Sequence, residues 1–209
     1  MKWSDIPYIW QECFKEAWES FQEGSRPIGA VILNEQGDIV ARGKSATLKE
    51  LSDSVISHNE LAHAEINALL KLDNRIHKKV TSYVLYTSLE PCPLCFGAFY
   101  MSGIRNLEYA ATDRYGGSTN IQDTTPYLSR KPIKVNGPIP ILEDLSVLLN
   151  VYFDSMIDFK KAIPVHEEMA KDYPEIVALA KDWTRQEKLK EYHHLQIQDV
   201  FSMMIDSIN

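Results

Sequence analysis

The amino-acid sequence predicts an α/β sandwich with some parallel strand pairing, followed by a helical C-terminal appendage. Through the middle of the chain, short runs of apolar, β-branched and aromatic residues alternate with segments whose apolar residues recur every three or four positions. Such alternation is typical of a sheet that is covered by helices. After Pro138 only the helical spacing remains. The 209 residues, 44% of them hydrophobic, are enough for a substantial core.

The first elements are a helix and a hairpin. Ser4 is in position to cap a helix that ends before Gly24 and whose apolar stripe consists of Trp10, Cys13, Phe14, Ala17, Trp18 and Phe21. The apolar runs 28–33 and 39–41 flank a turn at 35–38, which indicates two paired strands. Residues 44–61 are polar and irregular, which predicts a surface loop, with 50–55 as a candidate short helix.

Helices and strands then alternate. The pattern predicts a helix over 62–72, an interior strand over 80–89, a helix through 96–101, and strands over 106–112 and 133–135. Beyond Pro138 a helix is expected over 142–156, and Pro164 and Pro174 then divide two further helical stretches. We therefore predict a domain at 1–138 and a helical extension at 139–209.

The distribution of charge argues against a protein that holds nucleic acid mainly through its phosphates. The net charge is −7, and residues 140–209 carry 13 acidic against 7 basic side chains, so residues 1–139 are nearly neutral. Because neutralising phosphates requires clustered Lys and Arg, a small-molecule partner is favoured and nucleic acid is the weaker alternative. The sequence contains no run of 18 apolar residues and no leader-like N-terminus, so we expect a cytoplasmic protein that does not bind membranes.

The most distinctive chemistry lies in two short motifs, His63-Ala64-Glu65 and Pro91-Cys92-Pro93-Leu94-Cys95. One imidazole and two thiolates are three ligands for a tetrahedral zinc ion, and they leave the fourth position for water. Cys92 and Cys95 are three residues apart, so both sulfurs point the same way in the first turn of a helix. The N-terminus of that helix favours thiolates. The sequence thus predicts zinc as the cofactor, with His63, Cys92 and Cys95 as its ligands.

Glu65 is the candidate catalytic residue. In an ideal helix, residues two apart point to opposite faces, so the helix must begin near His63 if both side chains are to serve one site. A metal with an open position lowers the pKa of its water ligand. A carboxylate beside that water, not bound to the metal, can move protons. Glu65 is the acid in position to do this.

Two other interpretations of the cysteine pair stay open. Cys92 and Cys95 have the spacing of a redox dithiol, although such motifs need no upstream His-x-Glu. A closed structural zinc site would need a fourth protein ligand, for which His58 and His77 are close enough in sequence. Cys13 lies on the predicted apolar stripe and is expected to be a core residue.

The motifs resemble those of the cytidine deaminase-like superfamily, for which His-x-Glu followed by Pro-Cys-x-x-Cys is a signature. Together with residues 27–31, 62–66 and 85–98, they look like the branch that contains tRNA adenosine deaminases and bacterial guanine deaminases. The resemblance covers roughly residues 5–137. It implies a three-layer α/β/α sandwich with a five-stranded mixed sheet, a zinc ion held by His63, Cys92 and Cys95, a proton-transferring Glu65, and a homodimer.

The chain departs from that branch where the substrate would bind. In the branch, an asparagine in a Gly-x-Asn pattern contacts the base, whereas this chain has Ser45 there, which offers fewer hydrogen bonds. Asn59, in a loop that is slightly longer than usual, is a second candidate pocket residue. Tyr115 and Tyr127 are candidates to stack on a base. The seventy residues after the domain exceed the usual short C-terminal helices, and they could cover the pocket, form a dimer interface or recognise the substrate.

We therefore predict a zinc-dependent hydrolytic deaminase that converts an amino-substituted nucleobase, nucleoside or nucleotide to the oxo product and ammonia. A tRNA adenosine-to-inosine deaminase is the first alternative. An inactive deaminase fold that serves as an interaction module is the remoter one.

Overall fold

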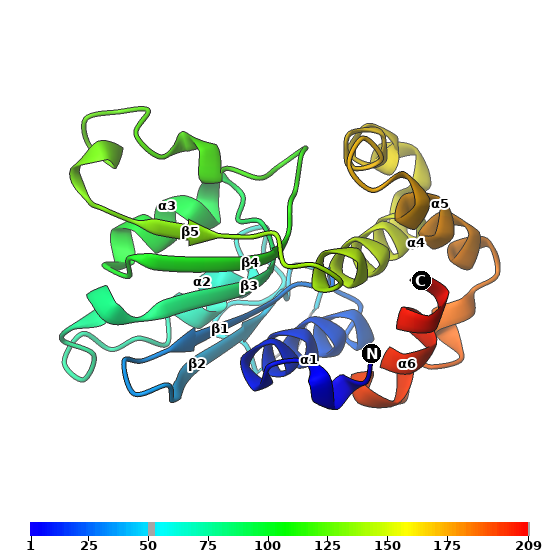
Figure 1. The fold of residues 1–209 in the computed structure, drawn as a ribbon, viewed down its shortest axis with the longest axis horizontal. Helices are drawn as coiled ribbons and strands as arrows, with labels where there is room; N and C mark the ends of the chain where they lie inside the picture. Colours follow the sequence, from blue (N-terminus) through cyan, green and yellow to red (C-terminus); the bar gives the residue numbers. More distant parts are fainter. Residues whose placement is uncertain (50–52, 209) are drawn as a thin grey trace.

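A five-stranded sheet lies between two layers of helices in the computed structural model, which describes residues 1–49 and 53–208 (Figure 1). The strands are β1 (Gly29–Leu33), β2 (Ile39–Lys44), β3 (Val84–Leu89), β4 (Asn106–Ala111) and β5 (Lys134–Asn136). They lie in the order β2-β1-β3-β4-β5. The pairs β1–β2 and β1–β3 are antiparallel, and β3–β4 and β4–β5 are parallel. The predicted three-layer fold with a mixed sheet is therefore confirmed.

The first helical layer consists of α2 (Ala64–Leu69) and α3 (Pro93–Ser102). Both helices pack on side chains that alternate along the strands, as the two-residue period of a strand requires. On β1, Ala30 and Ile32 face the cluster that contains Phe96 of α3, whereas Val31 faces the opposite side of the sheet. The same layer brings the beginnings of α2 and α3 close together.

The second layer combines α1 (Tyr8–Gln22) with α4 (Leu142–Met169), and α5 (Pro174–Arg185) and α6 (Ile197–Ile208) lie beyond it. One hydrophobic cluster joins these helices to the sheet and includes Phe14 of α1, Ala110 of β4, Leu145 of α4 and Phe201 of α6. The Trp3 ring packs edge-on against Phe201, with 5.2 Å between ring centroids. The two chain termini accordingly lie near each other (Figure 1). The helices after residue 138 thus share their core with the rest of the protein.

Several boundaries differ from those expected. Helix α1 begins at Tyr8, directly after Pro7, so Ser4 does not cap it and instead lies in a 3-10 turn, Trp3–Asp5. Strand β3 begins at Val84 because Val80–Ser82 form another 3-10 turn. In the candidate short helix at 50–55, residues 50–52 fall outside the described part of the chain, and 53–55 form a bend.

Helix α4 is longer than its periodicity indicated. It continues past 156 to Met169 and contains Pro164, which was expected to divide helical stretches. The interruption falls at Asp158, whose backbone is extended (φ −154°, ψ 88°). The Asp158 carboxylate accepts a hydrogen bond from the backbone N–H of Lys161 at 3.2 Å, as a helix-capping side chain does. A second helical segment therefore starts here, before the proline.

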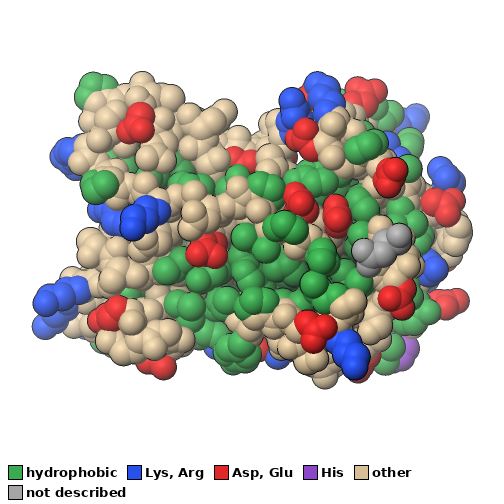
Figure 2. All heavy atoms as spheres, in the orientation of Figure 1, with side chains coloured by type: hydrophobic (Ala, Val, Ile, Leu, Met, Phe, Trp, Pro, Cys, Tyr) green, Lys and Arg blue, Asp and Glu red, His purple; other side chains and the backbone are tan. Residues whose placement is uncertain are grey.

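Hydrophobic side chains gather across the middle of one face, between the sheet and the C-terminal helices, with Lys and Arg mainly at the margins (Figure 2). This face thus presents no basic stripe of the kind that tracks a phosphate backbone. Within the described residues, no helix combines the length and the apolar character needed to cross a bilayer.

Candidate active site

The two motifs meet because each lies at the start of a helix. His63 precedes α2 with an extended backbone (φ −77°, ψ 155°), so its side chain leaves the helix end. Cys92 precedes α3 in the same way, Pro93 occupies the first helical position, and Cys95 lies in the first turn. The expectation that the helix begins at the His-x-Glu motif is confirmed, and Glu65 falls in the first turn of α2.

Nitrogen and sulfur atoms of His63, Cys92 and Cys95 come within 4.8 Å of one another. The Nδ1 atom of His63 lies 3.5 Å from Cys92 Sγ and 3.3 Å from Cys95 Sγ. For a tetrahedral zinc ion with ordinary Zn–N and Zn–S bond lengths, the expected N–S separation is about 3.5 Å. The donor set and its spacing therefore fit zinc. Within the described residues, no fourth His, Cys, Asp or Glu joins the group, which leaves one ligand position open.

The residues considered for a closed site lie outside the group of three donors. Cys13 is fully buried and its thiol donates to the carbonyl of Gly29 at 3.1 Å, as expected of a core residue. His77 faces the Tyr83 hydroxyl at 3.1 Å, and His58 is an exposed loop residue.

The surroundings favour a negative charge on sulfur. The interaction with the Cys95 side chain, with a further contribution from His63, lowers the pKa of Cys92 to about 4. The same interaction with Cys92, together with burial, raises the pKa of Cys95. The hydrogen bond with Cys92 raises the pKa of His63. One thiolate is thus stabilised before any metal binds, which is the protonation state that zinc coordination needs.

Glu65 lies against the three donor atoms but is not part of their group. Its side chain is only 4% exposed, and burial raises the pKa of its carboxyl group. The Thr87 hydroxyl of β3 donates to one carboxylate oxygen at 2.9 Å, and the Cys95 thiol donates to the other at 3.2 Å. The sheet therefore fixes the carboxylate beside the ligand cluster, where it can hold a proton.

These groups form one end of a cavity of about 430 Å³. Ser45 lines this cavity, as expected for a substrate-contacting position, whereas Asn59 does not. The Asn59 side chain accepts a hydrogen bond from the backbone of Leu61 at 2.8 Å, which is the role of a turn residue. Tyr115 and Tyr127 are exposed and are also absent from the lining.

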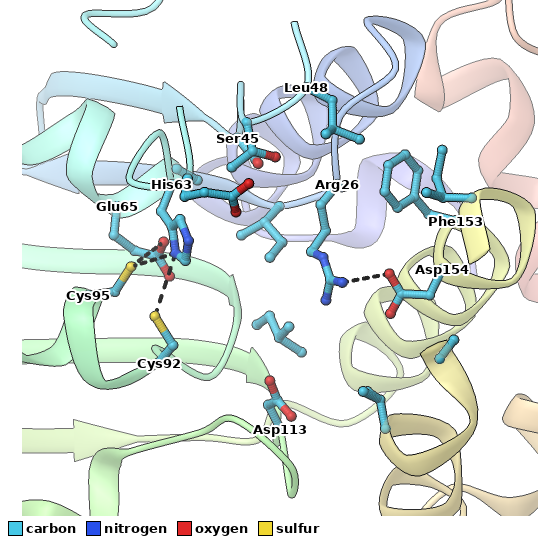
Figure 3. A pocket seen from close by; sticks show the side chains of 18 of the residues that line it. Arg26, Ser45, Leu48, His63, Glu65, Cys92, Cys95, Asp113, Phe153 and Asp154 are labelled. Carbon is cyan, nitrogen blue, oxygen red and sulfur yellow. Dashed lines mark hydrogen bonds and ion pairs between the residues drawn. The ribbon is translucent and has the colours of Figure 1, made fainter. Parts of the chain in front are cut away.

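The opposite wall of the cavity comes from α4, whose contributing side chains are Phe153, Asp154, Ile157, Asp158, Lys161, Ala162 and Val165 (Figure 3). Asp154 pairs there with Arg26, from the loop between α1 and β1, at 2.6 Å. Sequence patterns did not single out Arg26 or Asp154. Arg26 directly precedes the motif segment 27–31, and this position is the sequence feature that could have indicated a role for Arg26 in the site.

Residues 4–111 match the family model described as the cytidine and deoxycytidylate deaminase zinc-binding region. The chain belongs to this deaminase family. It is accordingly a zinc-dependent hydrolase that acts on C–N bonds, and zinc is its cofactor. This membership favours the enzyme interpretation over a redox dithiol or an inactive interaction module.

Relatives of this deaminase extend the similarity beyond the motifs. The tRNA-specific adenosine deaminase of Aquifex aeolicus is 30% identical over 154 residues, which cover 71% of this chain and 94% of that protein. The tRNA-specific adenosine deaminase of Bacillus subtilis is 32% identical over 111 residues, or 51% of this chain and 62% of that protein.

Solved structures show the same fold. One from a study of A-to-I editing by tRNA:A34 deaminases superposes with a TM-score of 0.56 at 27% identity, over 68% of this chain and 98% of that one. A guanine deaminase from Nitrosomonas europaea superposes with a TM-score of 0.53 at 21% identity, over 72% of this chain and 93% of that one, which shows the fold alone.

Proposed function

We propose that this deaminase hydrolyses an amino-substituted nucleobase, nucleoside or nucleotide, with His63, Cys92 and Cys95 as zinc ligands and Glu65 as the proton carrier. The observation that supports the assignment best is the buried Glu65 carboxylate beside the ligand cluster, at one end of a cavity of about 430 Å³. A cavity of this volume is within the usual range for small-molecule sites.

Zinc bound by these three side chains would supply an acidified water ligand as the nucleophile. Glu65, which lies beside the three ligands, would take a proton from the attacking water and deliver it to the ring nitrogen next to the carbon that bears the amino group. It then assists transfer of a proton to the departing nitrogen. The oxygen of the water forms a C–O bond, the C–N bond breaks, and water plus amino base give oxo base plus ammonia. The hydroxyl of Thr87 holds the carboxylate in place for both transfers.

A small substrate is favoured because α4 forms a wall of the cavity. Phe153, Ile157 and Val165 add apolar surface there, against which a planar heterocycle can pack. Ser45, on the opposite side of the cavity from α4, offers one hydroxyl for a hydrogen bond to the ring (Figure 3).

A tRNA adenosine is the second candidate substrate, because relatives named tRNA-specific adenosine deaminases match most of this chain. The two candidates are separated by comparing ammonia release from free bases and nucleosides with inosine formation in tRNA. The second candidate also requires tRNA binding at low ionic strength. A homodimer, which the family resemblance implies, is a further part of the proposal, and the mass in solution measures it.

Replacing Glu65 tests the catalytic assignment. Glu65→Ala is expected to keep its zinc, because Glu65 is outside the ligand group, while ammonia release falls at least about a hundredfold. The measurements are zinc content per chain and steady-state ammonia release. Glu16→Gln is a matched control, since burial also raises the pKa of Glu16, to about 7, but Glu16 does not line the cavity. Unchanged turnover in Glu65→Ala would show that another group carries the proton.

A further inference from the structure

The cavity has a second polar end, formed by Arg26 and Asp154. The Arg26 guanidinium lies 2.6 Å from the Asp154 carboxylate, and the pair faces the cavity from the side opposite the ligand cluster (Figure 3). Arg26 is held by its backbone, whose carbonyl accepts hydrogen bonds from the Ser20 hydroxyl at 2.6 Å and the Ile28 N–H at 2.7 Å. Asp154 is held by α4. Both partners therefore project from hydrogen-bonded backbone segments.

Both side chains of the pair line the cavity, and they differ in exposure. The Asp154 side chain is 8% exposed, whereas that of Arg26 is 41% exposed. A guanidinium carries five N–H donors, and one ion pair leaves several of them for a ligand. A molecule in the cavity thus meets donors of Arg26 and the carboxylate of Asp154 side by side.

The remaining charges of the cavity are mainly negative. Among the described lining residues, Lys161 is the only Lys or Arg besides Arg26, and its ammonium lies 3.8 Å from the Asp158 carboxylate. The acidic lining side chains apart from Glu65 are Glu60, Glu90, Asp113, Asp154 and Asp158. Both positive side chains are thus paired with acids, and a phosphate group would enter a site with excess negative charge.

We propose that the Arg26–Asp154 pair binds the end of the substrate remote from the reacting amino group, and that the site takes a phosphate-free amino heterocycle or its nucleoside. This inference rests on the deaminase function proposed above. The pair complements a group with an acceptor and a donor side by side, as found on the amide edge of a heterocycle and on the diol of a ribose. Apolar surface from Phe153 and Leu48 lies near the pair and suits a planar ring (Figure 3).

Steady-state kinetics on a matched substrate series test the substrate class. Each amino purine or pyrimidine is supplied as the free base, the nucleoside and the 5′-monophosphate, with amino pterins and triazines as further free heterocycles, and tRNA is included. We expect kcat/KM for the preferred base or nucleoside to exceed that for its monophosphate at least a hundredfold. A higher kcat/KM for the free base than for the nucleoside indicates that the pair contacts the ring. A higher kcat/KM for the nucleoside indicates that the pair contacts the ribose. A monophosphate or tRNA that reacts as well as the base and the nucleoside would overturn the inference.

Variants test the pair itself. Asp154→Asn and Arg26→Lys are expected to raise KM at least tenfold with a smaller change in kcat, to keep zinc, and to alter the rank order of substrates. Asp154→Glu, which keeps the charge, is expected to recover part of the loss. Asp172→Asn is the control, because Asp172 pairs with Arg114 at the same 2.6 Å and links the turn after α4 to the loop after β4, but it does not line the cavity.

A purely structural pair gives a different result. In that case Asp154→Asn lowers the melting temperature, while KM and the rank order of substrates stay unchanged, as they do in Asp172→Asn. If Asp154→Asn does not fold, Arg26→Lys decides by the same readouts. Failure of the deaminase proposal is distinct, because the wild-type protein with zinc would then release no ammonia from any substrate in the series.

Discussion

The three cysteines occupy two chemically different environments. Cys92 and Cys95 lie at the N-terminus of α3 beside an imidazole, and the pKa of Cys92 falls to about 4. Cys13 lies on the buried face of α1, where burial raises the pKa of its thiol. The same side chain is therefore suited to metal binding in one place and to core packing in the other, because solvation and neighbouring dipoles decide how easily the thiol loses its proton.

Single cysteine replacements should separate these roles. Cys92→Ala and Cys95→Ala are expected to lose stoichiometric zinc and activity, since two ligands do not hold the ion tightly. Cys13→Ala is expected to keep both and to lower the free energy of unfolding by about 1–2 kcal/mol through a small cavity and a lost hydrogen bond. Zinc content and urea unfolding measure the two effects. Zinc loss in Cys13→Ala, or its retention in Cys95→Ala, would contradict the assignment.

The proximity of the motif residues could be predicted from the sequence, because each motif fixes its own local geometry. Sequence reasoning placed His63, Glu65, Cys92 and Cys95 together because helix starts bring such spacings to one point. It also proposed Ser45 as a substrate contact, which stays a prediction although Ser45 lines the cavity, and it did not single out Arg26 or Asp154. Those two are 128 positions apart in the sequence, and nothing local to either indicates that they pair.

At the level of elements, α2 is positioned by a glycine on the strand beneath it. A Cβ atom added to Gly43 of β2 would lie 2.2 Å from the Ala64 carbonyl oxygen and 2.4 Å from the Ala68 nitrogen. Helix and strand are therefore closer than any side chain at this position permits. Asn67 of α2 reinforces the contact by donating to the Lys44 carbonyl at 3.1 Å. This close packing sets where His63 and Glu65 lie.

Gly43→Ala is expected to lower both stability and activity. The added methyl group meets rigid backbone, so α2 must shift, which costs on the order of 1–3 kcal/mol and displaces Glu65 from the ligand cluster. Gly97→Ala is the control, because a Cβ there meets nothing within 4 Å and alanine favours the helix by about 0.5–1 kcal/mol. Thermal unfolding and kcat/KM check both variants, and a Gly43→Ala protein with wild-type kinetics would show that α2 is not held in this way.

At the level of the whole molecule, the segment after residue 138 belongs to the same core as the deaminase motifs. Helix α4 contacts β3 and β4 and also forms one wall of the cavity. The Trp18 indole of α1 donates to the Leu195 carbonyl at 2.8 Å, which ties the first helix to the last part of the chain. The division into 1–138 and 139–209 remains a prediction, but the two segments bury their apolar side chains in common.

This shared core contains one histidine that should make stability depend on pH. His166 of α4 is fully buried, and neither ring nitrogen has a hydrogen-bond partner within the described structure. Burial, with Lys181 and Arg26 nearby, lowers the pKa of His166 to about 4. In the unfolded chain the pKa is about 6.5. Between these values the unfolded state binds a proton that the native state does not. The contribution of His166 to the free energy of unfolding is therefore complete above pH 6.5 and falls as the pH drops toward 4.

His166→Phe should remove this part of the acid sensitivity. Between pH 7.5 and pH 4.5 the wild-type protein is expected to lose up to roughly 3 kcal/mol more unfolding free energy than the variant. Urea unfolding at several pH values measures the difference, and contributions from other titrating groups are common to both proteins. Parallel pH profiles for the two proteins would rule out the buried neutral imidazole as the cause.

The sequence by itself determined the order of the main helices and strands, the zinc chemistry and the position of Glu65, because hydrophobic periodicity and short ligand spacings are local properties of the chain. Only the tertiary structure decided that α4 forms a wall of the active site and that Arg26 meets Asp154 there. The periodicity of α4 shows that the helix buries a face, but not what lies against that face. Which surfaces meet depends on the packing of the whole molecule, and that packing determines which side chains line the cavity opposite the two motifs.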